Sequence, residues 1–154
     1  MSAIELVSAL ALEVRSAVET YRLEADRQPR KAITVYEQFI PKAHMNDPSG
    51  QYHPLVVVTC RGVMDDEDNT IAEAGLTFGV YGESTLEEEP WRDLLNVMES
   101  VRLRLLERQL IGGCYRLMRP LEMEYAEVQP APFFYGEMTA RYVMYQPVER
   151  GSAR

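Results

Sequence analysis

The residues best suited to nucleophilic chemistry are two cysteines and two histidines: Cys60, Cys114, His44 and His53. A thiol becomes a strong nucleophile when a neighbouring base such as histidine takes its proton. Cys60 with His53, or Cys114 with His44, would supply that chemistry. Both histidines, however, lie in a proline-rich loop, and buried cysteines are usually packing residues. The chain also has no G-x-S-x-G motif, so the sequence predicts a protein that is not an enzyme and has no catalytic residues.

Paired carboxylates are a second source of chemistry. Glu122 and Glu124 are two residues apart, so on a strand their side chains share a face, as general acid–base catalysis can require. Solvent-exposed strand faces commonly carry the same pattern, and Arg141 on a neighbouring strand is a ready ion-pair partner. We interpret these carboxylates as surface ion-pair residues.

Three segments could bind a ligand. The acidic stretch 65–69 could attract calcium, but it lacks the glycine and the twelfth-position glutamate of an EF-hand loop, so we interpret it as a solvated or partner-facing hairpin tip. Gly112–Gly113 follows a helical pattern, whereas a phosphate loop precedes one. The basic residues 27–31 are balanced by Glu24 and Asp26. The cysteines lack the spacing of a zinc site, and we expect neither a metal nor a cofactor.

Charge is distributed unevenly along the chain. Its 24 acidic and 16 basic residues give a net charge of −8, which does not match the electrostatic footprint of a nucleic-acid-binding protein. Residues 63–89 hold nine acids and no lysine or arginine, whereas residues 101–119 hold five arginines against Glu107. The sequence therefore predicts a subunit with one acidic and one basic region.

Size and composition are those of a single globular domain. The chain has 154 residues, of which 46% are hydrophobic and 26% charged. No apolar run reaches the ~18–20 residues that a bilayer-spanning helix needs, and the N-terminus carries Glu5 early and no basic region of a signal peptide. The cysteine usage predicts a reducing compartment. We expect one domain over residues 1–147 and a frayed tail over residues 148–154.

The N-terminal third predicts one helix and one strand. Residues 32–40, rich in β-branched and aromatic side chains, predict a strand, and the proline-rich residues 41–54 a loop. Before them, apolar residues at spacings of three and four predict a helix over residues 3–24 with Ser2 as its N-cap. The apolar stripe of that helix is Ile4, Val7, Ala11, Val14, Val18 and Tyr21.

An antiparallel pair of strands follows. Apolar side chains alternate over residues 55–62 and 71–81, a period typical of half-buried strands. The acidic residues 64–69 would form the tip of this hairpin. The face of the second strand opposite its apolar side chains carries Glu73, Gly75, Thr77 and Gly79.

The clearest helical pattern begins near Pro90 and is predicted to stop at Ile111–Gly113. Proline suits the first turn of a helix, and Gly112–Gly113 predicts a glycine C-cap. The apolar stripe of this helix is Trp91, Leu94, Leu95, Met98, Val101, Leu105 and Leu106.

A long hairpin completes the predicted fold, with arms at residues 116–125 and 134–144. Pro120 within the first arm predicts an edge position or a bulge. The element order is then α-β-β-β-α-β-β. This order predicts an α+β fold in which a mostly antiparallel β-sheet carries two helices packed on one face.

Three consecutive aromatic residues, at positions 133–135, stand at the entry to the last strand. A strand buries only alternate side chains in one core, so Phe134 should point inward and leave Phe133 and Tyr135 for another surface. Adjacent exposed aromatic side chains are typical of interfaces. The alternative is that a loop folds over them.

Four segments resemble small phage and prophage proteins of the tail terminator, or tail-completion, type: Pro90–Leu106, Pro120–Thr139, Val35–Pro41 and His53–Val58. The resemblance covers most of residues 35–146 and consists of spacing and residue class, with no catalytic signature. It implies an α+β virion structural protein at the head–tail junction. Such a subunit forms a ring, six-membered in this family, that caps the head-proximal end of the tail tube and joins it to the head connector.

The resemblance also implies the partners. These would be further copies of the chain, the tail tube protein and the head–tail connector protein, with no membrane, and with DNA passing through the channel without sequence-specific binding. Assembly would take place in the host cytoplasm. Alternatives are a neighbouring head–tail connector (neck) protein, an enzyme with a carboxylate or Cys/His site, and a small non-catalytic cytoplasmic binding module.

A closed ring needs one patch of each subunit to meet a different patch of the next. We expect the acidic region 63–89 of one protomer to meet the arginine-rich region 102–119 of its neighbour. A channel that passes DNA should avoid gripping it, which suits acidic side chains. The subunit-interface candidates are Arg102, Arg104, Arg108, Phe133 and Tyr135, and the lumen or partner-facing candidates are Asp65, Asp66 and Asp68.

Overall fold

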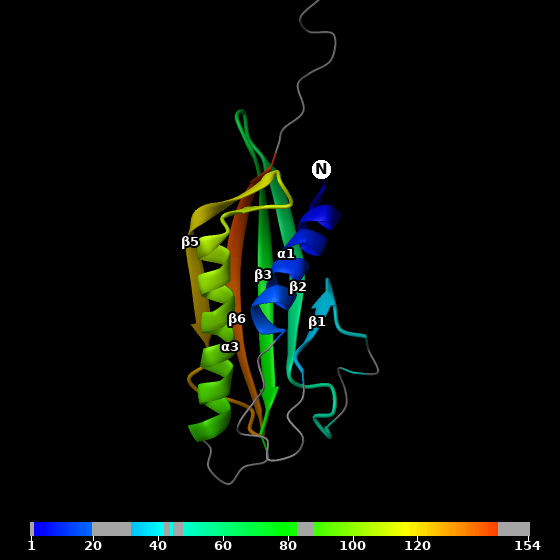
Figure 1. Cartoon of the computed structure of the whole chain (residues 1–154), viewed down its shortest axis with the longest axis vertical. Helices are drawn as coiled ribbons and strands as arrows, with labels where there is room; N and C mark the ends of the chain where they lie inside the picture. The colour runs from blue at the N-terminus through cyan, green and yellow to red at the C-terminus, as the bar shows by residue number, and fades with distance from the viewer. Residues whose placement is uncertain (1, 20–31, 42–43, 45–47, 83–87, 145–154) are drawn as a thin grey trace, which may run out of the picture.

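The computed structural model describes residues 2–19, 32–41, 44, 48–82 and 88–144. The strands form one sheet in the order β1-β2-β3-β6-β5-β4, in which β1 and β2 are parallel and the other neighbours antiparallel. Both helices cover the same face of the sheet (Figure 1), so the predicted α+β fold is confirmed. The elements are α1 (Ala3–Val18), β1 (Thr34–Glu37), β2 (Leu55–Asp65), β3 (Thr70–Tyr81), α3 (Glu88–Glu107), β4 (Leu110–Ile111), β5 (Tyr115–Tyr125) and β6 (Phe133–Met144).

Helix α1 begins as predicted, because the Ser2 side chain accepts a hydrogen bond from the Glu5 backbone N–H at 3.2 Å. Its buried stripe is shifted from the predicted one. Ile4 is 80% exposed, and Leu6 and Leu10 are buried in its place. The described part of the helix ends at Val18, so the predicted continuation to residue 24 lies outside the described residues.

Helix α3 ends at Glu107, and the predicted glycine C-cap is wrong. Gly112 and Gly113 instead form the turn between β4 and β5, where their φ angles of +57° and +75° are ones that glycine adopts without strain. Of the predicted stripe of α3, Leu94, Met98, Val101 and Leu105 are buried, Leu95 and Leu106 are half-buried, and Trp91 is 42% exposed. The short strand β4 was not predicted, since two residues carry no periodicity.

Strand β1 is shorter than predicted because the chain turns at Gln38, whose φ is +72°. The Gln38 side chain then takes the place of a further strand residue. Its amide accepts from the Cys60 backbone N–H at 3.0 Å and donates to the Cys60 carbonyl at 3.2 Å. Beyond Cys60, the outer edge of β2 is therefore open among the described residues.

Two register shifts interrupt the sheet. One lies between Cys60 and Gly62 in β2 and makes Arg61 an extra residue. The other lies between Met118 and Glu122 in β5 and confirms the irregularity predicted at Pro120.

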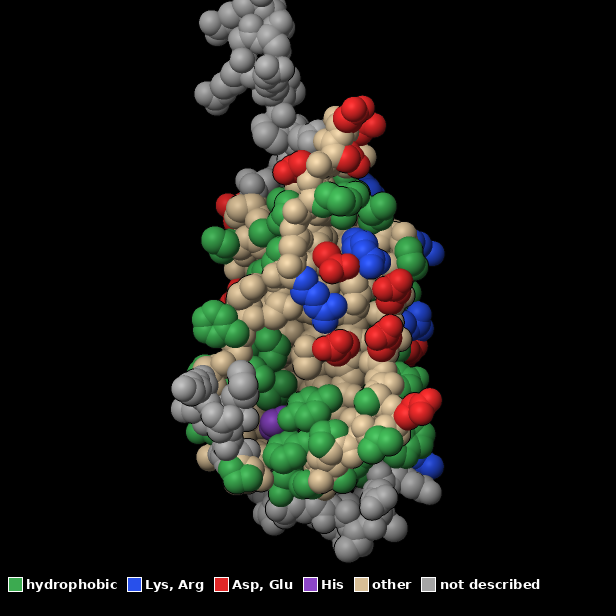
Figure 2. Space-filling model, turned by 180° about the vertical axis from the view of Figure 1, so that it is seen from behind, with side chains coloured by type: hydrophobic (Ala, Val, Ile, Leu, Met, Phe, Trp, Pro, Cys, Tyr) green, Lys and Arg blue, Asp and Glu red, His purple; other side chains and the backbone are tan. Residues whose placement is uncertain are grey.

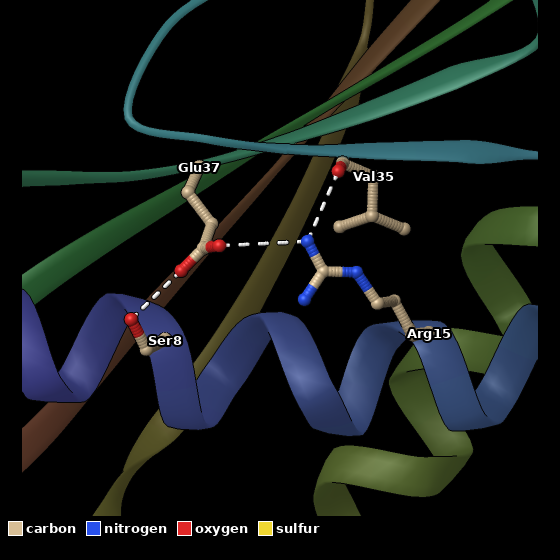
Figure 3. A network of polar contacts seen from close by, with 4 residues as sticks. All are labelled: Ser8, Arg15, Val35 and Glu37. Atoms are coloured by element: carbon tan, nitrogen blue, oxygen red, sulfur yellow. Dashed lines mark hydrogen bonds and ion pairs between the residues drawn. The ribbon is translucent and has the colours of Figure 1, made fainter.

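The hydrophobic core lies between the helices and the sheet. Leu76, Phe78, Met138 and Tyr142 from the central strands are fully buried against apolar side chains of α1 and α3. Polar contacts also hold α1 to the edge strand β1 (Figure 3): Ser8 donates to Glu37 at 2.8 Å, and Arg15 donates to the Val35 carbonyl at 3.3 Å. Neither described helix is long and apolar enough to span a lipid bilayer.

Candidate functional site

The side of the sheet away from the helices, here called the open face, is one candidate surface. Charged side chains gather over its upper half and hydrophobic side chains over its lower half (Figure 2). Both halves depend on β3, the central strand, whose open face carries Glu73, Gly75, Thr77 and Gly79 as predicted.

Gly75 makes room for the charged half. The bulge puts Arg61 on the open face, and its guanidinium crosses β3 to donate to the Thr139 hydroxyl at 3.1 Å and to lie 3.6 Å from the Glu137 carboxylate. A Cβ atom on Gly75 would be 2.3 Å from Nε of Arg61. The missing side chain therefore lets Arg61 join β2 to β6.

The predicted ion pair of Arg141 is confirmed. Its guanidinium lies 3.1 Å from Glu73 on β3 and 3.6 Å from Glu122 on β5. Arg141 thus bridges two strands, and Glu122 is a surface ion-pair residue in the sense predicted. The charged half of the open face is largely neutralised within the subunit.

Aromatic side chains make up the other half. Phe133 and Tyr135 point away from the core while Phe134 is buried, as predicted. His53, from the loop before β2, lies with its ring centroid 5.0 Å from Phe133, and its Nε2 is 3.1 Å from the Tyr135 hydroxyl. A Cβ atom on Gly79 would lie 2.8 Å from the Tyr135 ring. The loop thus half-buries both aromatic residues, and burial raises the pKa of Tyr135; their interface role stays a prediction.

The two histidines have aromatic and hydroxyl neighbours. Nδ1 of His44 is 3.0 Å from the Tyr36 hydroxyl, and the His44 ring stacks on Tyr52 with a centroid separation of 3.8 Å. The thiol of Cys60 donates to the Gly62 carbonyl. The two histidines thus pack among aromatic side chains, whereas Cys60 and Cys114 are partly buried against the hydrophobic core.

The acidic tip joins β2 to β3, as predicted. Asp66 accepts from the backbone N–H groups of Asp68 and Asn69, at 2.8 and 2.6 Å, which lowers the pKa of its carboxyl group. Asp65 accepts from the Thr70 hydroxyl. Glu67 and Asp68 are exposed, and their carboxylates form no ion pair within the described part of the chain. Two acids therefore hold the turn, and two face solvent.

The three predicted interface arginines have partners within the subunit. Glu99, one turn before Arg102 on α3, binds its guanidinium bidentately, and this contact lowers the pKa of Glu99. Arg104 and Arg108 both approach the buried Glu13 of α1, with N–O distances of 2.8 and 3.4 Å. These two arginines hold α1 to α3, and their role between subunits stays a prediction.

Two other arginines are left for outside contacts. Arg116 and Arg119, both on β5, are exposed and form no ion pair among the described residues. Arg119 and Arg102 flank a small groove between α3 and β5, whose apolar lining is Leu106, Pro120 and Leu121. We call Arg116, Arg119 and this groove the β5 flank. Sequence reasoning included Arg116 and Arg119 in the basic region but could not tell them from the paired arginines.

A second, larger groove lies at the other end of α3. Trp91, Tyr125 and Val128 line it, and their side chains are 42%, 53% and 85% exposed. Exposed large hydrophobic side chains in one place are typical of protein–protein contacts. Among the described residues, no cluster of three or more metal-ligating side chains was found.

No protein-family model and no curated protein match the sequence. A solved structure does match: a chain of the virion of the native gene transfer agent (GTA) particle superposes with a TM-score of 0.52 and 12% sequence identity. The match covers 94% of this chain and 98% of that chain. The protein therefore shares its whole fold with a chain of that virion particle.

Proposed function

We propose that this protein is a virion structural subunit of the tail-terminator type, without catalytic activity. The observation that carries the proposal is the fold shared, over 94% of this chain, with a chain of the GTA virion particle. The sequence resemblance to tail terminators supports the same role. The subunit would form a six-membered ring that caps the head-proximal end of the tail tube and joins it to the head connector.

The surfaces of the subunit suit such a role. Most charged side chains on the open face of β3 and β6 are paired within the subunit. Among the described residues, Glu67 and Asp68 of the acidic tip and Arg116 and Arg119 of the β5 flank form no ion pair and have opposite charges. A heterologous ring contact needs two different, complementary patches. In the ring, Asp65, Asp66 and Asp68 would face the DNA channel or a neighbouring subunit.

Electron microscopy of purified protein mixed with tail tubes tests the proposal. We expect negatively stained rings with a central hole, bound at one end of each tube. Rings that bind a purified head–tail connector but no tube would favour a neighbouring neck protein instead. If the protein forms no ring, either alone or on tubes, the proposed function is wrong.

A further inference from the structure

Both edges of the sheet are open over part of their length among the described residues. On one side, β4 pairs only with Tyr115 and Arg116, so the outer edge of β5 carries no strand from Met118 onward. On the other side, β1 pairs with β2 only as far as Val58. Open strand edges bind other chains unless they are covered or charged.

The open stretch of β2 lies at the height of Arg116 and Met118 of the β5 flank, where β4 covers β5 as far as Arg116. The register carries Met64 of β2 across β3 and β6 to Arg116 of β5. It carries Gly62 in the same way to Met118. A rotation about an axis that runs along the strands therefore brings the end of the β2–β3 hairpin of one copy beside the β5 flank of the next.

The two regions have complementary charge. Residues 62–70, here called the hairpin end, carry the exposed Glu67 and Asp68 together with Asp65 and Asp66. The β5 flank carries Arg116 and Arg119, which have no acidic partner within the described part of the subunit. Opposite potentials on facing patches select the register and suppress wrong pairings.

The two regions also have apolar surface to bury. Val63 and Met64, next to the acids, are 49% and 62% exposed. The groove of the β5 flank, which Arg102 and Arg119 also line, offers the apolar side chains of Leu106, Pro120 and Leu121. An apolar contact with charges at its rim has the composition of a typical protein–protein interface.

We propose that the β5 flank binds the hairpin end of a second copy of this chain, so that each subunit gives its hairpin to one neighbour and receives that of the other. This inference rests on the proposed function and identifies the two surfaces of its ring contact. It assigns the basic side to Arg116 and Arg119, since Arg104 and Arg108 hold the two helices together.

Two charge-reversed proteins test the contact. One carries Glu67→Arg and Asp68→Arg, which leave the turn-forming Asp65 and Asp66 in place, and the other carries Arg116→Glu and Arg119→Glu. In either variant by itself, side chains of like charge would face each other at every contact. We therefore expect native mass spectrometry to show at least a tenfold loss of rings relative to the wild type. Mixed in equal amounts, the two proteins have opposite charges at every contact if they alternate, and an even-membered ring should return.

The matched control is Glu124→Arg with Glu127→Arg, which changes the charge by the same amount at the far end of β5 and in the turn that follows it, and should leave the rings intact. Circular dichroism checks that each variant is folded. If wild type and both reversed proteins all form rings, or if the mixture forms none, this inference is wrong and the proposed function stands. If the wild type forms no ring, either alone or on tail tubes, the proposed function itself fails.

Discussion

The two faces of the sheet meet their surroundings in different ways. On the covered face, apolar side chains of β3 such as Leu76 and Phe78 pack directly against the helices and are fully buried. On the open face, β3 carries Gly75 and Gly79, and side chains of neighbouring elements lie across it. On the covered face, the side chains of β3 itself fill the space beneath the helices. On the open face, the side chains of Arg61, Tyr135 and His53 lie over the glycines of β3.

The difference shows where the subunit can bind others. The covered face is closed by helices, and most charges of the open face are already paired within the subunit. Among the described residues, charges without an ion pair occur beside exposed apolar surface at the flanks, namely at Glu67 and Asp68 of the hairpin end and at Arg116 and Arg119 of β5. The proposed assembly through the flanks would leave most of both faces of the sheet uncovered.

The sharpest contrast is between two adjacent residues of β3. Leu76→Ala should lower the free energy of unfolding by about 2–5 kcal/mol, because it leaves a cavity in the core of the covered face. Thr77→Ala, on the half-buried open face, should cost under about 1 kcal/mol. Urea unfolding measures both. Equal losses would mean that the open face is packed as tightly as the core.

The two glycines of the open face should differ from each other. Gly79→Val should cost about 1–3 kcal/mol, since the new side chain meets the Tyr135 ring and His53. In Gly75→Val the nearest atoms to the new Cβ belong to the guanidinium at the end of the flexible Arg61 side chain, whose surface ion pair is worth about 0–1 kcal/mol. The urea midpoint should fall for the first variant and change little for the second. The reverse order would overturn the roles given to these two glycines.

The helix–helix contact offers a smaller effect. Glu13→Gln should lower the free energy of unfolding by about 1–2 kcal/mol, because it removes the charge that binds Arg104, while the exposure of Arg108 limits the loss. Glu99→Gln, which removes the exposed pair with Arg102, is the control and should have no resolvable effect. If Glu13→Gln leaves the free energy of unfolding unchanged but the variant no longer forms rings, then Arg104 and Arg108 act between subunits.

The smallest effect should come from the buried Tyr142, whose hydroxyl has no hydrogen-bond partner among the described residues. Burial raises its pKa well above the ordinary value of 10.0. Above pH 10 the unfolded chain loses this proton and the folded chain keeps it, so stability falls as pH rises. Tyr142→Phe should flatten that fall and change stability at pH 7 by under about 1 kcal/mol. Thermal unfolding between pH 7 and 11 measures this, and an unchanged alkaline slope would contradict it.

Much of this architecture could be predicted from the sequence because hydrophobic periodicity is a local signal. Period two located β2, β3, β5 and β6 and their faces, and the 3.6-residue period located both helices. The role of Gly75 could not be predicted, since it depends on Arg61 being turned over by a bulge on another strand. Local signals do not encode such cross-strand neighbours.

The candidate interface could be predicted only in outline. Charge counts along the chain identified an acidic and a basic region, and the hairpin tip was placed correctly. The partner of Arg104 is Glu13, 91 residues away, so the sequence could not show which arginines are paired within the subunit. In the folded subunit Arg104 and Arg108 share Glu13, whereas Arg116 and Arg119 form no ion pair among the described residues.

The molar mass of the purified protein in solution, measured by light scattering over a range of concentrations, tests the central claim most directly. Contact between the hairpin end and the β5 flank would be head-to-tail, and in the six-membered ring of the proposed function it gives a particle of six 17.6 kDa subunits, which we predict. A dimer that keeps its mass at every concentration would contradict the account, because two subunits that bury the same patch on each other leave no surface for a ring.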